Sequence, residues 1–290
     1  METGCSTGTI EAYRSDLQKG VLPFFRKRGR FDLSSVDKSD IRDYMDFLVS
    51  EKGNSNITRR RKLAAIKSFF NYMVENEELG INPAASIKSP KITDGKPVYL
   101  NDVECLELLK TIARVAKRKV KDRDMAMVIL FLHTGLRVSE LINLKLTDID
   151  LGSAQIKVMR KGNKEQYLHL NNEAVAALRK YVANRPQTQD RHFFIGAKGQ
   201  KLGRNYVYDV ISRYLKLAGM DKGKWGPHLL RHTFCTRLHQ KGVDPLVIKQ
   251  LAGHRSLDTT MKYVSIESKE EIQALEKLEL GRSFLTLTCF

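Results

Sequence analysis

Residues 226–264 read GPHLLRHTFCTRLHQKGVDPLVIKQLAGHRSLDTTMKYV, and the rest of the chain is best interpreted from this stretch. Pro227 suits the first turn of a helix, where its missing N–H costs nothing, and Gly242 suits the end of that helix. On such a helix His228 and Arg231 are three residues apart and therefore share one face. The spacing thus predicts an imidazole and a guanidinium presented side by side.

Two further short helices are predicted in the same stretch. Asp244-Pro245 is typical of a cap followed by a first helical turn, and Gly253 is typical of the end of that helix. Ser256 can cap another helix, which carries Tyr263. The buried stripe of the helix after Asp244 is predicted to contain three apolar residues: Leu246, Ile248 and Leu251.

The turns between these helices deliver four polar side chains toward one point: His228, Arg231, His254 and Tyr263. A phosphate suits this group, because a guanidinium binds phosphate oxygens bidentately and an imidazole can donate or accept a proton. The phenol is the attacking group in the set. The residues therefore favour chemistry at a phosphate.

This pattern resembles the signature of the tyrosine recombinases, the phage-integrase family of DNA strand-exchange enzymes, in its simple two-domain Xer-like or transposon-type form. That family has H-x-x-R, then G-H, then a tyrosine nine residues after that histidine, as this sequence does. Two further blocks occur upstream in the expected order. Residues 133–150, HTGLRVSELINLKLTDID, supply Arg137, and residues 159–170, MRKGNKEQYLHL, supply Lys161. The resemblance covers the chain from Thr9 to about Leu280.

The resemblance implies a mechanism in which Tyr263 attacks the scissile phosphate and becomes a 3′-phosphotyrosyl group. Arg137 and Arg231 would bind the non-bridging oxygens, and Lys161 would protonate the leaving 5′ oxygen. This chemistry implies no cofactor, no metal and no ATP, because the phosphotyrosyl bond keeps the energy of the phosphodiester.

The other family positions are matched one by one. His228 would handle the proton, His254 would donate a hydrogen bond to the phosphate, and Glu140, three residues after Arg137, would orient that arginine. The family commonly has glycine where this sequence has Arg160, and we expect Arg160 and Lys164 to contact DNA from the same hairpin.

The composition agrees with a polyanionic partner. The chain has 50 lysines and arginines against 33 aspartates and glutamates, a formal charge of +17. Nucleic acid and an anionic membrane surface would both suit this excess, but no stretch of about 18 apolar residues and no signal pattern is present. Four scattered cysteines without C-x-x-C argue against a disulfide framework or a zinc site, so a reduced, cytoplasmic setting is expected.

The first part of the chain is predicted to be a helical, DNA-binding domain over residues 1–89. Helices are expected from Thr9, from Ser39 and over residues 55–77, with a short last segment to Ile87. The third has an apolar face of Ile57, Leu63, Ile66, Phe70 and Met73. Its opposite face has five basic residues that we expect to contact DNA: Arg59, Arg60, Arg61, Lys62 and Lys67.

A linker is predicted over residues 90–97, which are rich in Pro and charged residues without periodicity. Residues 1–89 carry 15 basic and 12 acidic side chains, a balance of +3, whereas residues 90–290 carry 35 and 21, a balance of +14. The basic excess therefore accompanies the proposed chemistry, as expected for a duplex held around its scissile phosphate.

Residues 98–290 are predicted to form an α+β catalytic domain. Helices are expected after Asn101, over residues 122–133, from Ser139, and over residues 172–183 and 203–218. Residues 155–160 and 165–170 are strand-like and are joined by a Gly-Asn turn, which predicts a small antiparallel sheet. The fold is thus expected to be mainly α, with a four-helix first domain, and the resemblance implies a C-shaped clamp that closes on DNA.

The resemblance also implies an assembly: four protomers on two duplex DNA sites with inverted core repeats, active in pairs, for integration, excision or resolution of DNA elements. No small-molecule substrate is expected. A capping box at Ser268 predicts a helix near 268–280 with an apolar stripe. That helix would dock on a neighbouring protomer or fold back on its own domain.

Three other classes of protein share some of these sequence features. His228 and His232 are four residues apart, as in H-E-x-x-H zinc proteases, but Leu229 takes the place of the glutamate base. A DNA-binding regulator without catalysis would be free to lose Tyr263 or an arginine, and none is lost. A topoisomerase of the IB type shares the tyrosine and arginines, and the sequence leaves this alternative open.

Overall fold

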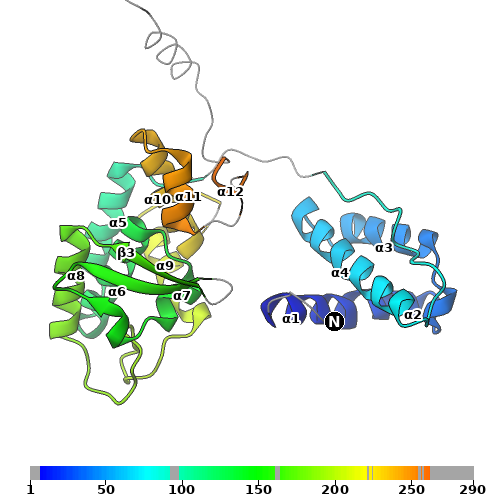
Figure 1. The fold of residues 1–290 in the computed structure, drawn as a ribbon, viewed down its shortest axis with the longest axis horizontal. Coiled ribbons are helices and arrows are strands. Elements are labelled where there is room, and N and C mark those ends of the chain that lie inside the picture. The colour runs from blue at the N-terminus through cyan, green and yellow to red at the C-terminus, as the bar shows by residue number, and fades with distance from the viewer. Residues whose placement is uncertain are drawn as a thin grey trace, which may run out of the picture. The chain divides into compact units, whose positions relative to one another are not determined.

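The computed structural model describes residues 7–91, 98–160, 164–220, 222–223, 225–253, 256 and 258–261. The chain divides into two compact units, Met1–Asp94 and Gly95–Phe290, and each unit has its own hydrophobic core. Figure 1 shows the first unit as a group of helices and the second as helices around a small sheet.

The described part of the first unit contains four α-helices: α1 (Thr7–Asp16), α2 (Leu22–Lys27), α3 (Lys38–Ser50) and α4 (Asn56–Glu75). A π-helical turn (Leu17–Val21) joins α1 to α2, and a short 3-10 turn (Leu33–Ser35) precedes α3. The carboxylate of Asp37 accepts hydrogen bonds from the backbone N–H groups of Ser39 and Asp40, which fixes the start of α3.

The core of the first unit is formed by the apolar faces of these helices. On α4, Leu63, Ile66 and Phe70 are fully buried, as the helical spacing predicts. The prediction for Ile57 is wrong, because its side chain is 65% exposed. Ile57 lies in the first turn of α4, before the part of the helix that packs on the core.

The described part of the second unit contains helices and a three-stranded antiparallel sheet in the order β1-β2-β3. The strands are β1 (Ile149–Asp150), β2 (Gln155–Arg160) and β3 (Lys164–His169). In the β2–β3 hairpin Arg160 is the register partner of Lys164. The helices are α5 (Asp102–Val115), α6 (Arg118–Thr134), α7 (Val138–Asn143), α8 (Asn172–Ala183), α9 (Arg204–Leu217), α10 (Pro227–Gln240), α11 (Pro245–Ala252) and α12 (Asp258–Met261), with a 3-10 turn at Leu146–Asp148.

Helix α6 is the central element of this unit, and α5, α8 and α10 all pack against it. The apolar run from Ala126 to Leu132 explains this place, because nearly every side chain in it is buried. The helix starts four residues earlier than the predicted Asp122 and ends at Gly135, whose φ of +61° suits a residue without Cβ.

Helix α11 packs against α10 through Ile248 and Ala252, which join Phe234 and Cys235 in a small separate core. Leu246 was expected in this buried stripe, but its side chain is 61% exposed. It lies in the first turn of α11, before the residues that touch α10. Figure 1 shows α11 beside α12 at one end of the unit.

The predicted fold class is confirmed: the chain is mainly helical, with a helical first unit and a second unit that contains a small antiparallel sheet. The helix expected near 268–280 lies outside the described residues. Among the helices described, none has the length and apolarity needed to cross a membrane.

Candidate active site

Arg137 lies in the turn between α6 and α7 and is held by Glu140, one helical turn further on. The carboxylate of Glu140 accepts hydrogen bonds from the backbone N–H of Arg137 (2.8 Å) and from its Nη1 (2.9 Å). Glu140 is buried, so these charge-assisted bonds are shielded from water. The two residues that the sequence pairs are therefore in direct contact.

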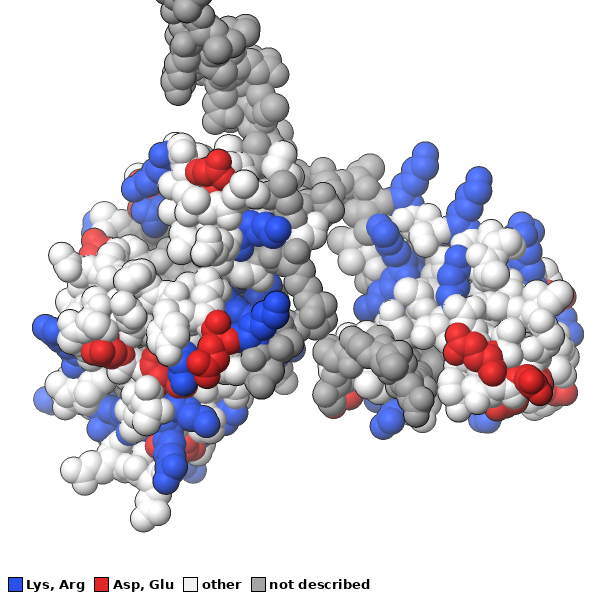
Figure 2. Space-filling model, viewed as in Figure 1, with Lys and Arg blue, Asp and Glu red and all other residues white. Residues whose placement is uncertain are grey.

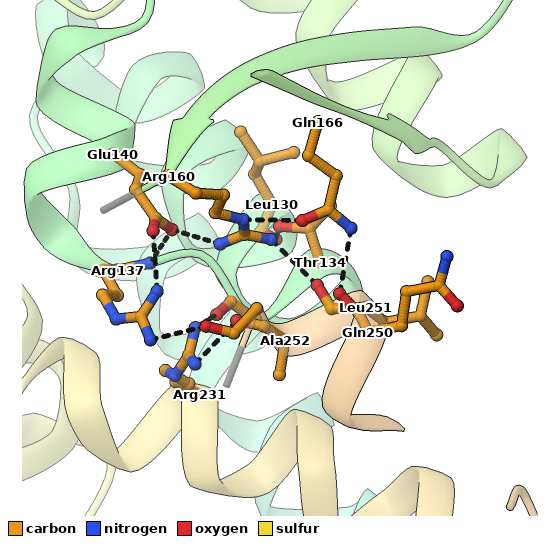
Figure 3. A network of polar contacts seen from close by, with 12 residues as sticks. Leu130, Thr134, Arg137, Glu140, Arg160, Gln166, Arg231, Gln250, Leu251 and Ala252 are labelled. Carbon is orange, nitrogen blue, oxygen red and sulfur yellow. Dashed lines mark hydrogen bonds and ion pairs between the residues drawn. The ribbon is translucent and has the colours of Figure 1, made fainter. Parts of the chain in front are cut away.

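Arg231 lies on α10, and its side chain is buried. Its Nη1 donates to the carbonyl oxygen of Gly135, in the turn that leads to Arg137, and its Nη2 donates to that of Ala252 at 2.7 Å. Nη2 of Arg137 donates to the next carbonyl along the chain, that of Gly253, at 2.8 Å. Two arginines from separate elements thus meet at the C-terminal end of α11 (Figure 3).

Two residues of the β2–β3 hairpin complete this network. Arg160 donates from Nη1 to Glu140 (2.6 Å), from Nη2 to the carbonyl oxygen of Leu251 (2.9 Å) and from Nε to the side chain of Gln166 (2.8 Å). Gln166 in turn donates to the carbonyl oxygen of Gln250 at 2.9 Å. The carbonyl groups of residues 250–253 therefore each accept a bond from a different side chain (Figure 3).

Positive charge dominates this cluster. Among the residues described, Glu140 is the carboxylate that pairs with Arg137 and Arg160. Burial, followed by the charge of Arg137, lowers the pKa of Arg231 to about 10. The guanidinium still keeps its charge at neutral pH, and a bound anion would stabilise that charged form. A cavity of about 400 Å³ borders Arg137, Glu140, Arg160 and Gly253.

His228 lies three residues before Arg231 on α10, and its ring packs edge-on against that of Tyr208, with centroids 6.0 Å apart. Although His228 is exposed overall, desolvation of its ring by the surrounding protein is the main cause that lowers its pKa. The positive charges of Arg204, Arg231 and Arg137 lower this pKa further. The imidazole is therefore neutral at pH 7 and can accept a proton.

Three predicted site residues, Lys161, His254 and Tyr263, lie outside the described residues. Their described neighbours in sequence are Arg160, Gly253 and Met261. Arg160 bonds Glu140, and the carbonyl group of Gly253 accepts a bond from Arg137. No group of three or more His, Cys, Asp or Glu side chains in the described ranges could hold a metal ion.

Arg160, for which a DNA contact is predicted, is bonded within the protein. Its side chain is 9% exposed, and all three of its guanidinium nitrogens donate within the protein. These bonds hold the guanidinium within the protein, and the DNA contact of Arg160 stays a prediction. Lys164, at the start of β3, is exposed.

The five basic residues predicted on α4 have different surroundings. Arg61 and Lys62 both pair with the buried carboxylate of Asp16, and Nζ of Lys67 donates to a backbone carbonyl group at 3.0 Å. Arg59 donates to the side chain of Asn56 at 3.2 Å, and Arg60 is exposed. On the face in view in Figure 2, basic side chains stand out along one edge of this unit and acidic ones gather along another.

The sequence carries no signal for the role of Gln166 or of the α11 carbonyl groups. A backbone carbonyl oxygen is present at every residue, so no residue type marks the ones that accept from an arginine. The partners of Arg160 come from three elements and depend on tertiary packing. The pairing of Arg137 with Glu140, in contrast, follows from their spacing at the start of a helix.

Comparisons with known proteins agree with this arrangement. A model described as "Phage integrase family" matches residues 99–270, and one described as "Phage integrase, N-terminal SAM-like domain" matches residues 1–77. The tyrosine recombinase XerC of Thermodesulfovibrio yellowstonii is 34% identical over 285 residues, which covers 96% of this chain and 92% of that protein. The tyrosine recombinase XerD of Listeria monocytogenes is 32% identical over 272 residues, which covers 92% of this chain and 90% of that protein.

Solved structures give the same result. The XerH site-specific recombinase in a post-cleavage complex with palindromic difH substrate has a TM-score of 0.78 and 25% identity, covering 92% of this chain and 79% of that one. The Tn1549 transposon integrase in complex with circular intermediate DNA has a TM-score of 0.75 at 21% identity, covering 94% of each chain, and supports the fold. The chain therefore belongs to the phage integrase family of tyrosine recombinases, the enzymes that exchange DNA strands.

Proposed function

We propose that this chain is a site-specific recombinase that cuts and rejoins duplex DNA with Tyr263 as the nucleophile. One observation carries the proposal: Arg137 and Arg231 come from separate elements to adjacent carbonyl groups at the end of α11. The sequence that follows these carbonyl groups is the family's Gly-His and, nine residues later, its tyrosine. A phosphate beside the two arginines would thus be near the segment that bears the nucleophile.

Cleavage is a transesterification. The phenol oxygen of Tyr263 forms a bond to phosphorus, the bond from phosphorus to the 5′ oxygen breaks, and the product is a 3′-phosphotyrosyl group. Lys161 gives its proton to the leaving 5′ oxygen. Arg137 and Arg231 bind the non-bridging oxygens and stabilise the negative charge that develops on them. Strand joining is the reverse reaction with a new 5′ hydroxyl, so it requires no ATP, metal or other cofactor.

The remaining residues support these steps. His228, neutral at pH 7 because its pKa is lowered, accepts the phenol proton. His254 donates a hydrogen bond to the phosphate. Glu140 keeps the guanidinium of Arg137 in the orientation that its two hydrogen bonds define.

The proposed partner is duplex DNA with inverted core sites. Residues 1–89 and 98–290, connected by a linker over residues 90–97, would close on it as a clamp, with Arg59, Arg60 and Lys164 among the phosphate contacts. The related XerH, with its difH substrate, supports DNA as the partner. Four protomers would hold two DNA sites, and the helix near 268–280 would dock on a neighbour.

The test is a suicide substrate with a nick beside the scissile phosphate, which lets the short 5′-hydroxyl fragment diffuse away and traps the covalent product. Tyr263→Phe should bind this DNA and form no adduct on a denaturing gel. Tyr167→Phe is the matched control, because Tyr167 is an exposed tyrosine on β3. Adducts at wild-type yield in Tyr263→Phe would exclude this tyrosine, and strong inhibition by EDTA would contradict metal independence.

A further inference from the structure

We infer that Arg160 is a positioning residue for cleavage: from the end of β2 it holds Glu140 and the end of α11, so that Arg137 and Arg231 keep the spacing that a phosphate requires. The inference rests on the proposed function of the two arginines. It gives a place in the mechanism to a residue at a position where glycine is common in the family.

The contacts of Arg160 tie three elements together. Its guanidinium bonds Glu140 on α7, Gln166 on β3 and the carbonyl group of Leu251 on α11, at 2.6 to 2.9 Å. The planar guanidinium can make these three bonds at once because its donors point in fixed, different directions. A lysine ammonium could neutralise Glu140 but would not span the same three acceptors.

The first consequence concerns Glu140, which Arg160 shares with Arg137. Oε2 of Glu140 accepts from Nη1 of Arg160 and from the backbone N–H of Arg137, while Oε1 accepts from Nη1 of Arg137. Arg160 therefore fixes the plane of the carboxylate that orients the catalytic arginine. Without Arg160 that carboxylate loses the shortest of its three hydrogen bonds and has more freedom to rotate.

The second consequence concerns the last turn of α11. Gln166 and Arg160 bond the carbonyl groups of Gln250 and Leu251, and the next two carbonyl groups bond Arg231 and Arg137. A shift of this turn would move the acceptors of both catalytic arginines together. The hairpin thus holds the backbone on which the arginine pair is aligned.

Gly253 permits the close approach that this arrangement needs. A Cβ at this position would lie 2.8 Å from Nε and 2.9 Å from Cζ of Arg160. The guanidinium is itself fixed by its three bonds, so it is not a flexible group that could easily move aside. The glycine that ends α11 therefore also makes room for Arg160.

The test compares variants in the full-length chain. Arg160→Ala removes the three bonds, Arg160→Lys keeps the charge, and Gln166→Leu removes two side-chain bonds without changing the charge. Arg179→Ala is the matched control, because Arg179 also donates to a backbone carbonyl group, that of Leu151, but on the exposed surface of α8. The measurements are DNA affinity, thermal unfolding and the single-turnover rate of adduct formation with the nicked substrate.

We expect Arg160→Ala to slow adduct formation about 10- to 100-fold while the DNA dissociation constant changes by less than about threefold, because the effect is one of alignment. Arg160→Lys and Gln166→Leu should have intermediate rates, and Arg179→Ala the wild-type rate. If Arg160→Ala does not fold, the two milder variants carry the comparison. Wild-type cleavage rates in every foldable Arg160 and Gln166 variant would overturn the inference.

Two altered substrates separate alignment of the arginines from a general loss of structure. A methylphosphonate at the scissile position, used as both stereoisomers, removes the charge that the arginines neutralise, so the deficit of the variants should shrink to about threefold or less. A sulfur in place of the 5′ oxygen leaves without a proton and should not rescue them. The inference is overturned if the variants are slowed as much on the methylphosphonate as on the ordinary substrate. It is also overturned if the sulfur substrate restores their full rate, because that result would point to Lys161 instead. Absence of any Tyr263 adduct in the wild-type protein would instead overturn the proposed function.

Discussion

Arg137 and Arg231 donate to neighbouring carbonyl groups, those of Gly253 and Ala252, although one arginine lies in the turn before α7 and the other on α10. Their guanidinium groups are therefore close together, and Glu140 pairs with Arg137, whereas the hydrogen bonds of Arg231 go to backbone carbonyl groups. Such a site should bind a tetrahedral anion even apart from DNA.

Inorganic phosphate should consequently raise the melting temperature more than chloride at equal ionic strength. Binding to the folded state alone should raise the free energy of unfolding by about 2.7 kcal/mol at a phosphate concentration 100 times the dissociation constant. Arg137→Ala should weaken this response, because it removes one of the two guanidinium groups, whereas Arg179→Ala should keep it. A full response in Arg137→Ala, measured by differential scanning fluorimetry, would exclude the pair as an anion site.

His228 should titrate below the ordinary histidine pKa of about 6.5, because desolvation and three arginines disfavour its charged form. The folded protein binds this proton less readily than the unfolded chain, so the free energy of unfolding falls as the pH drops below about 6.5. Bound DNA phosphate should move the pKa upward. Proton–nitrogen NMR titration, assigned with His228→Gln, measures both values, and a midpoint at or above 6.5 in the free protein would refute the argument.

Gly135→Ala should destabilise the second unit by about 3 kcal/mol, as the sum of a left-handed backbone and an overpacked core. The φ of Gly135 is +61°, and a Cβ there would lie 2.3 Å from the ring of Phe234. Because the carbonyl group of Gly135 accepts from Arg231, the cleavage rate should fall as well. Urea denaturation measures the loss, and Gly203→Ser, at an open helix start with nothing within 4 Å, serves as the neutral control.

On α4, Arg60 and Arg61 should behave differently although they are neighbours. Arg60→Ala should reduce the salt dependence of DNA binding by about 0.9 in logarithmic slope, the value for one lost phosphate contact. Arg61→Ala should change this slope less, because the guanidinium is already paired with the buried Asp16. Anisotropy titrations over a range of salt concentrations provide the comparison, and equal slopes for the two variants would contradict it.

Local signals in the sequence were sufficient for much of the fold. Residues 172–183 and 155–160 form the predicted helix and strand, because an Asn cap and a period of two act over a few residues. The two-residue strand β1 was not predicted, since it exists only by pairing with β2. Ile57 and Leu246 were placed in buried faces by spacing alone, and spacing does not show where a packed face begins.

In the candidate site, the identity of the main residues was predictable from the sequence, but their contacts were not. Arg137, Glu140, His228 and Arg231 were found from motif spacing, and the structure brings the two arginines to one place. The burial of the Arg160 side chain was not predictable, because it depends on acceptors from three elements that are far apart in sequence. Charge in a hairpin favours a surface interpretation, whereas here a buried carboxylate and two hydrogen-bond acceptors take up the guanidinium.

The peptide dipoles of α11 add up along its axis, so its last carbonyl groups carry a partial negative charge of up to about half an electron. That charge faces Arg137, Arg160 and Arg231, whose mutual repulsion it offsets. The helix end thus acts as a built-in counterion for the cations. A DNA phosphate, with a full negative charge, is the stronger acceptor and can take over some of the arginine hydrogen bonds. The carbonyl groups at the end of α11 can accept these bonds again when the strand leaves.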